Sequence, residues 1–368
     1  MAAPYRADQL GSFLRPPEIL DARAANAEGR LGAAELQAIE DKAILQVLEM
    51  QRQVGVDVYS DGEFRRGSFL TSFADSVAGF GAPGEAVTWD WHGPEGGMVR
   101  TTARPVEAKL SQTRRLTGGE IAFMKEHAPG PYKITVPSAN LLNMMGAFKP
   151  GVTDTVYGGR ADLLQDIGRI IKNEIQAAVD EGVPYVQIDA PNYAQFCDEQ
   201  YRQRMREAGT DPDQALDEAI AAENATLEVN RSDGVTLAFH ICRGNNRSRW
   251  LNSGGYEPIA EKMFGSLKVD RFLLEYDTDR SGGFEPLRFI PKGTKVVLGL
   301  VTTKESNMES QDLLLRRIDE ASKYVPVDDL ALSPQCGFAS VSGGNLLSMD
   351  DQRRKLELVV DTARKVWG

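Results

Sequence analysis

Short apolar runs alternate along the chain with longer stretches in which apolar residues recur every three or four positions. The longer stretches are typical of helices that bury one face, and the short runs are typical of buried strands. We predict helices at 36–54, 164–178, 213–230, 258–264, 310–324 and 349–366. We predict strands at 8–13, 56–59, 132–136, 185–188, 235–239, 272–274, 295–301 and 330–332.

Strands that alternate with helices form a parallel sheet, and eight such units favour closure into a barrel. We therefore expect an α/β fold, a (β/α)8 TIM barrel, built as a single domain by residues 1–368. The alternation breaks near residues 74–112, where Gly, Pro, Thr and Trp dominate and an inserted β-ribbon is expected. The insertion contains a G-x-G-x-x-G pattern, but β-prone residues follow it instead of a helix, so we expect no dinucleotide site.

Composition narrows the class of protein. Apolar residues make up 42% and charged residues 26%, as in soluble globular proteins, and the net charge of -11 argues against nucleic-acid or anionic-membrane partners. The start of the chain lacks the apolar stretch of a targeting signal, and no run is long enough to span a membrane. We therefore expect a cytoplasmic protein. Three cysteines do not make a disulfide framework.

Polar residues with metal-binding chemistry stand at the ends of several predicted strands. His240 and Cys242 are two residues apart, so both side chains point to one side of an extended segment. Glu275 and Cys336 end two other strands. In a barrel of this kind the active site lies at the carboxyl ends of the strands. Imidazole, two thiolates and a carboxylate suit Zn²⁺.

The simpler interpretation is that the cysteines are small buried residues and that the histidine is an ordinary polar group. Convergence of three strand ends favours a metal site over that interpretation, whereas Cys197 lies past a strand end and we expect it to be structural. A zinc ion with two thiolate ligands and a carboxylate ligand suits the binding of a substrate thiol as thiolate better than the activation of water. The sequence thus predicts alkyl transfer to a thiol.

These motifs resemble the catalytic carboxyl-terminal barrel of the cobalamin-independent methionine synthase family, over essentially the whole chain. The resemblance is carried by Gly11-Ser12-Phe13, Gly62-Glu63, Gln187-Ile188-Asp189-x-Pro191, His240-x-Cys242, Glu275 and Pro334-x-Cys336-Gly337. It implies a zinc-dependent methyltransferase that activates homocysteine as a zinc thiolate and methylates it to methionine. The implied zinc ligands are His240, Cys242, Glu275 and Cys336.

The resemblance also implies a binding site for the amino-acid part of homocysteine. Ser12 would bind the carboxylate, and Glu63 and Asp189 would hold the ammonium, which needs anionic acceptors. The alternative is that Glu63 pairs with Arg65 or Arg66 and that Asp189 caps a turn.

Several features depart from the family pattern on the folate side. Full-length members have a second, amino-terminal barrel that helps to hold the folate, and we find no counterpart in this chain. The family's pterin-stacking Trp is missing from 140–145, Ala190 stands where a second carboxylate usually follows Asp189, and 301–303 lacks the family's His. We therefore expect a methyl donor other than polyglutamylated methyltetrahydrofolate, either a methylated corrinoid protein or a small methylated compound.

Three other functions stay open. A related zinc enzyme opens epoxides with coenzyme M, although Glu63 and Asp189 would repel its sulfonate. A metal-free decarboxylase of the uroporphyrinogen type would need an arginine-lined cleft, for which Arg243, Arg247 and Arg249 are candidates. The third is a non-catalytic protein that binds zinc or an amino acid.

Overall fold

The computed structural model describes residues 5–84, 86–142 and 147–368. Its helices are α1 (Pro17–Ala27), α2 (Ala33–Val54), α3 (Thr71–Ser76), α4 (Gly118–His127), α5 (Ala139–Leu142), α6 (Arg160–Asp180), α7 (Glu199–Glu207), α8 (Pro212–Leu227), α9 (Glu257–Ser266), α10 (Gln311–Ser322) and α11 (Met349–Trp367). Its strands are β1 (Val77–Phe80), β2 (Ala86–Trp91), β3 (Gly97–Thr102), β4 (Val106–Gln112), β5 (Lys133–Pro137), β6 (Tyr185–Asp189), β7 (Thr236–Ile241), β8 (Arg271–Glu275), β9 (Lys295–Val301) and β10 (Leu330–Pro334).

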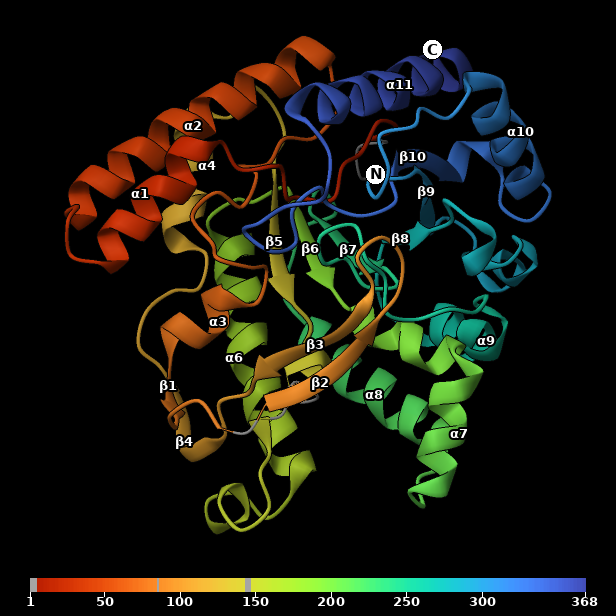
Figure 1. Ribbon diagram of the computed structural model, residues 1–368. Coiled ribbons are helices and arrows are strands. Elements are labelled where there is room, and N and C mark those ends of the chain that lie inside the picture. Colours follow the sequence, from red (N-terminus) through yellow and green to blue (C-terminus); the bar gives the residue numbers. More distant parts are fainter. Residues whose placement is uncertain (1–4, 85, 143–146) are drawn as a thin grey trace.

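Six parallel strands form the central sheet, in the order β10-β9-β8-β7-β6-β5 (Figure 1). Two extended segments, near Ala7 and Tyr59, bridge the gap between the edge strands β10 and β5 and so close the sheet into a ring. Ala7 pairs in parallel with Leu332 of β10, and its carbonyl oxygen accepts a hydrogen bond of 3.0 Å from the Asp57 amide. Tyr59 in turn pairs in parallel with Tyr132, directly before β5. The predicted TIM barrel is thereby confirmed, with each of its eight predicted strand regions contributing to the wall.

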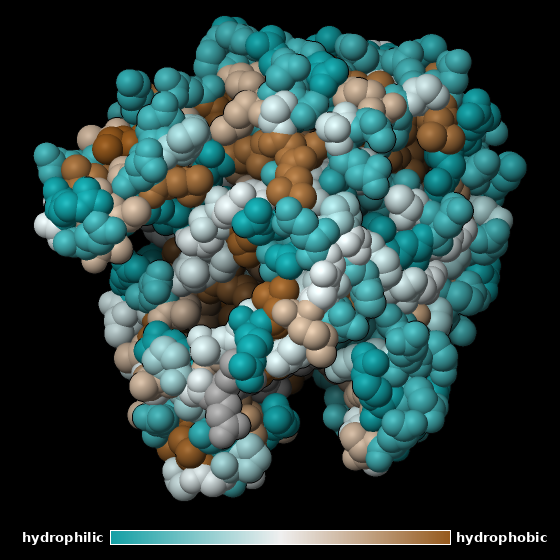
Figure 2. Space-filling view, viewed as in Figure 1, coloured by the Kyte–Doolittle hydropathy of each residue, from teal (hydrophilic) through white to brown (hydrophobic). Residues whose placement is uncertain are grey.

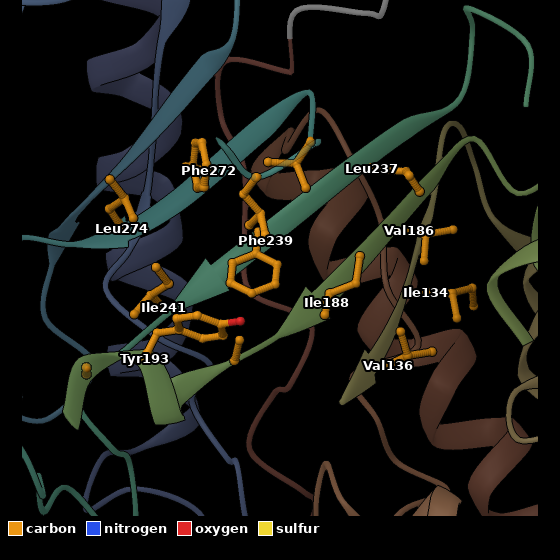
Figure 3. Close-up of a cluster of buried hydrophobic side chains, with 14 of the residues drawn as sticks. Ile134, Val136, Val186, Ile188, Tyr193, Leu237, Phe239, Ile241, Phe272 and Leu274 are labelled. Atoms are coloured by element: carbon orange, nitrogen blue, oxygen red, sulfur yellow. The ribbon is translucent and has the colours of Figure 1, made fainter. Parts of the chain in front are cut away.

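Side chains pack on both faces of this wall. One small cluster collects residues from around the barrel and fills its interior: Tyr5, Leu10, Val58, Tyr185, Ala238, Leu273, Val297 and Ala331. The alternate residues of β5 to β8, such as Val136, Ile188 and Phe239, join the large core on the other face (Figure 3). Burial on both faces explains why these strands are continuous apolar runs in the sequence.

The helices follow the predicted amphipathic pattern. In α6, Leu163, Ile167, Ile171 and Ile175 are all buried, as their regular four-residue spacing requires. Helix α2 ends at Gly55, whose φ of 88° lies in the left-handed region that glycine adopts readily. The sequence did not predict α1, α3, α4, α5 or α7. Within the described ranges, no helix combines the length and apolar character needed to cross a membrane.

The insertion forms two antiparallel ribbons, β1 with β4 and β2 with β3, in the region predicted from the sequence. In Figure 1 the β2–β3 ribbon lies across the space below the arrowheads of β5 and β6. Two backbone hydrogen bonds attach the ribbon to the loop after β7: His92 N donates to Trp250 O (2.8 Å) and Trp250 N donates to His92 O (3.0 Å). The insertion is therefore anchored over the carboxyl ends of the barrel strands.

Candidate metal centre and substrate cavity

Three of the predicted metal ligands meet at the carboxyl end of the barrel. His240 lies near the end of β7, Cys242 follows the same strand, and Cys336 follows β10. A nitrogen of the histidine and the two sulfur atoms all lie within 4.8 Å of one another, and all three residues are buried. Residues 94 positions apart in the sequence are thus close enough to bind one ion.

The orientation of His240 is fixed by its neighbour on β6. Asp189 and His240 are partners in the parallel register, and the His240 Nδ1 atom lies 2.8 Å from Asp189 Oδ1. The same carboxylate oxygen accepts a 2.8 Å hydrogen bond from Gln187 Nε2. His240 Nε2 is buried and has no hydrogen-bond partner. A carboxylate on Nδ1 leaves the Nε2 lone pair available for a metal.

The two cysteines shift each other's pKa in opposite directions. The hydrogen bond from Cys242 holds the pKa of the Cys336 thiol well below its usual range, and the same interaction raises the pKa of Cys242 well above it. Burial lowers the pKa of His240, but contacts with Asp189 and Cys336 outweigh this effect and raise it to about 10. Metal binding must therefore displace protons. The unpartnered Nε2 atom, the soft sulfur donors and their spacing fit a zinc ion.

Glu275, the fourth predicted ligand, ends β8 and is fully buried, but its carboxylate is not part of that compact group. Its Oε2 atom accepts a 2.8 Å hydrogen bond from the Arg243 amide, and its Oε1 atom accepts one of 2.6 Å from Arg280. Burial opposes ionisation, but the charges of Lys304 and Arg280 outweigh burial and keep the pKa of Glu275 below its usual range. In this structure Glu275 is an ionised group that fixes the loop carrying Cys242.

A cavity of about 280 Å³ adjoins the three candidate metal ligands and also reaches Ser12, Glu63 and Asp189. The Glu63 backbone has a φ of 58°, an uncommon conformation for a residue with a side chain. Its Oε1 atom accepts a 2.7 Å hydrogen bond from Thr135 Oγ1, whereas its Oε2 atom is buried without a partner. Burial raises the pKa of Glu63 to about 7. One carboxylate oxygen is therefore available to a cationic ligand.

The alternative pairing of Glu63 with its neighbouring arginines is only partly realised. Arg65 pairs with Asp41 at 2.5 Å. Arg66 forms its closest ion pair with Glu120, and its guanidinium lies 3.8 Å from Glu63 Oε1. Neither arginine occupies the second oxygen of Glu63.

Ser12 is held beside the Gly62-Glu63 turn by parallel backbone pairing with Gly62. A Cβ atom at Gly337 would lie 2.0 Å from Ser12 Oγ, which explains the glycine that follows Cys336. The Ser12 side chain, the Cys336 loop and the Gly62-Glu63 turn are thus packed into one unit.

The inserted ribbon covers the cavity with aromatic side chains that the sequence analysis did not predict as site residues. Trp89 and Trp91 of β2 line the cavity, together with Phe69. The ring of Trp91 packs against Gly244, where an added Cβ would lie 3.1 Å from it. Figure 2 shows a hollow beside the ribbon with hydrophobic residues in its depth. The spacing of two residues in a β-prone segment, which puts both rings on one face, was the available signal.

Among the described residues that line the cavity, none is Lys or Arg. Arg243 donates hydrogen bonds to Gly254 O and to Tyr256 Oη, and Arg247 lies 3.8 Å from Glu95. Arg249 donates to Asn246 O at 3.0 Å. The arginine-lined cleft needed by a decarboxylase of the uroporphyrinogen type is therefore not formed by these residues.

The sequence and the structure were compared with those of known proteins. A model of the cobalamin-independent synthase catalytic domain matches residues 6–365. The uncharacterized protein YxjH of Bacillus subtilis is 38% identical over 99% of this chain and 95% of its own length. A methionine synthase of Saccharolobus solfataricus is 23% identical over 90% of this chain and 88% of its own.

Solved structures agree in fold. A putative vitamin-B12-independent methionine synthase from Listeria monocytogenes superposes with a TM-score of 0.74 at 28% identity, covering 100% of this chain and 99% of the other. A B12-independent methionine synthase from Shewanella sp. W3-18-1, solved in complex with selenomethionine, has a TM-score of 0.74 at 20% identity, covering 99% and 98%.

Proposed function

Because the chain belongs to the cobalamin-independent methionine synthase family, whose catalytic domain is a methyltransferase, we propose that it methylates the thiol of homocysteine to form methionine in a zinc-dependent reaction. One observation carries the proposal: His240, Cys242 and Cys336 meet at the same cavity in which Glu63 keeps a buried oxygen without a partner. A soft metal site and an anionic amino-acid site are the two parts that this reaction needs.

His240, Cys242 and Cys336 would hold the zinc ion. Glu275, the fourth ligand predicted from the sequence, would have to exchange one of its hydrogen bonds to Arg243 or Arg280 for the metal. When bound, zinc would lower the pKa of the homocysteine thiol so that it is ionised at neutral pH. Once metal binding has displaced the proton from Nε2, Asp189 would hold the imidazole of His240 in the tautomer protonated at Nδ1, and we assign it this positioning role in addition to its predicted contact with the ammonium.

The amino-acid part of homocysteine would lie between Glu63 and Ser12. The Glu63 Oε2 atom would accept a hydrogen bond from the ammonium, which stabilises the ionised form of this buried carboxyl. The hydroxyl of Ser12 would donate to the substrate carboxylate. Both residues line the cavity that contains the metal ligands, which supports placing the substrate sulfur near the metal.

The cavity supports a donor other than polyglutamylated methyltetrahydrofolate, because its described lining contains no lysine or arginine that could pair with a polyglutamate tail. Of the two remaining donor classes, the ribbon over the cavity favours a small methylated compound over a methylated corrinoid protein. We propose that residues 1–368 act as one catalytic domain, since the insertion contributes to the same cavity. The cytoplasmic location stays a prediction.

The lack of lysine and arginine in the described lining also disfavours coenzyme M, whose sulfonate would face Glu63 and Asp189. Removing zinc and then restoring it, with methionine formation measured at each step, distinguishes a zinc-dependent methyltransferase from a metal-free decarboxylase and from a non-catalytic binding protein. We expect methionine to form from homocysteine and a methyl donor only in the zinc-loaded protein. Equal methionine formation by the metal-free protein would contradict the proposal.

A further inference from the structure

We propose that the cavity binds its methyl donor as a small onium cation, a methylated sulfonium or quaternary ammonium with a short anionic or hydroxyl tail. This donor class rests on the proposed function, because it needs the thiol acceptor. The inference comes from three features of the cavity: its aromatic wall, the charge of its lining and its unpartnered polar atoms.

The aromatic wall comes from two sides. Trp89 and Trp91 extend from the inserted ribbon, and Phe69 comes from the loop that pairs with the segment after Cys336, where Phe69 N donates to Ser340 O (3.3 Å). Aromatic faces attract methylated cations through their negative quadrupole, with Trp the strongest. The Trp89 ring is fixed by a 2.9 Å hydrogen bond from its Nε1 atom to Thr101 Oγ1, so it presents an ordered face.

The charge of the lining points the same way. Glu63 and Asp189 are the two residues of the described lining that carry a carboxyl group, and that lining contains no lysine or arginine. Buried cations near the lining are paired with other groups: Lys304 Nζ donates to Gly244 O at 2.9 Å, and Arg280 pairs with Glu275 and Asp277. Arg66 lies 3.8 Å from Glu63 Oε1 but forms its closest ion pair with Glu120. A cation enters such a site with favourable electrostatics, whereas a polyanion does not.

Two buried hydrogen-bond donors in the lining have no partner, Trp91 Nε1 and Asn192 Nδ2. Buried donors without partners are costly, so a ligand acceptor there would be stabilising. Neither donor is charged, which suits a carboxylate or hydroxyl on a short tail. A small sulfonium or ammonium compound with such a tail satisfies the rings, the carboxylates and these donors together.

An onium donor also suits the reaction with an ionised thiol. The sulfur of homocysteine attacks the methyl carbon, and a new sulfur–carbon bond forms. The bond from this carbon to the positively charged sulfur or nitrogen breaks, and its electron pair stays on the leaving atom. The products are methionine and a neutral thioether or tertiary amine, so the step needs no oxidant or reductant.

Binding tests the inference without any metal. Choline and its uncharged isostere 3,3-dimethylbutan-1-ol are titrated into the metal-free protein while tryptophan fluorescence is recorded. We expect choline to bind at least about tenfold more tightly, as a desolvated cation–π contact requires. Trp89→Leu and Trp91→Leu should each lose most of this preference, whereas Trp367→Phe, remote in α11, should keep it. Equal affinity for the two compounds, or a preference unchanged in both leucine variants, would overturn the inference.

A second measurement separates this inference from the proposed function. Dimethylsulfonioacetate is added to the zinc-loaded protein with homocysteine, and methionine and proton release are both measured. We expect methionine, with a rate reduced about tenfold or more by Trp91→Leu, while proton release on homocysteine binding is unchanged. If protons are released on homocysteine binding but no methionine forms and choline does not bind, the donor class alone is overturned. Absence of proton release would overturn the thiol activation, and the choline titration would still decide the cation site.

Discussion

The Nδ1 atom of His240 lies 2.8 Å from Oδ1 of Asp189 across the parallel pair β6 and β7. This contact connects the metal group to the substrate cavity, because both side chains line that cavity. It also determines which nitrogen of the histidine remains for a metal. The Asp189 and His240 motifs, 51 residues apart in the sequence, are therefore joined by one hydrogen bond.

Replacing Asp189 by asparagine should weaken zinc binding. An amide in place of the carboxylate no longer favours the imidazole tautomer with a free Nε2 lone pair, and loss of such a partner typically costs 10- to 100-fold in metal affinity. Competition with a chromophoric chelator measures the change. A zinc affinity equal to that of the wild type would show that Asp189 does not position the histidine.

Serine variants of Cys336 and Cys197 should differ in the amount of zinc that the protein binds. Cys336→Ser should lose most bound zinc, because it removes one of the clustered donors. Cys197→Ser is the matched control: this cysteine is also buried, but its Sγ atom contacts the carbonyl oxygen of Tyr193 at 4.0 Å and lies outside the metal group. Metal analysis of the purified variants distinguishes them. Full zinc in the Cys336 variant would refute the ligand assignment.

The affinity for the amino-acid part of the substrate should depend on Glu63 and on pH. Burial raises the pKa of Glu63 to about 7, so below this pH the free protein holds a neutral carboxyl and above it a carboxylate. Binding of an ammonium should therefore strengthen about tenfold from pH 6 to pH 8. Methionine is a suitable ligand because it has no thiol to titrate. Calorimetry with Glu63→Gln should give weaker binding without this rise, and an unchanged pH profile in that variant would remove Glu63 from the site.

Close packing of Gly337 against Ser12 should make the glycine hard to replace. Gly337→Ala should destabilise the fold by about 1–3 kcal/mol, as overpacking does, since its Cβ would lie 2.0 Å from Ser12 Oγ. Gly343→Ala is the control, because an added Cβ there meets nothing within 4 Å. Combining Gly337→Ala with Ser12→Ala should recover part of the loss. Thermal unfolding that is equal in both glycine variants would contradict this packing.

Periodicity was sufficient to predict the barrel, because each strand and each long helix has its own local pattern. Helix α7 (Glu199–Glu207) escaped prediction since its sequence, EQYRQRMRE, has almost no apolar stripe and Arg202 is its one buried residue within the described helix. The metal group was predictable because strand ends of a barrel converge. In contrast, the contact of Glu275 with Arg280 depends on how a loop folds back, which spacing does not reveal.

The position of the insertion also could not be predicted from local sequence patterns. Its β-ribbon was expected from composition, but its position over the cavity depends on the backbone pairing of His92 with Trp250, 158 residues later in the chain. No local pattern encodes such a pairing. Trp89 and Trp91 could be placed on one strand face from the sequence, whereas their contact with the substrate cavity needed the structure.

Proton release on homocysteine binding tests thiol activation most directly. Zinc-loaded protein is mixed with homocysteine at pH 7 in weak buffer with a pH indicator, and Cys336→Ser and Cys197→Ser are treated in the same way. Since a free thiol is only a few per cent ionised at this pH, binding as thiolate should release close to one proton per zinc site in the wild type and in the Cys197 variant, and almost none in the Cys336 variant. Homocysteine binding to the zinc-loaded wild type without proton release would contradict the proposed role of the site.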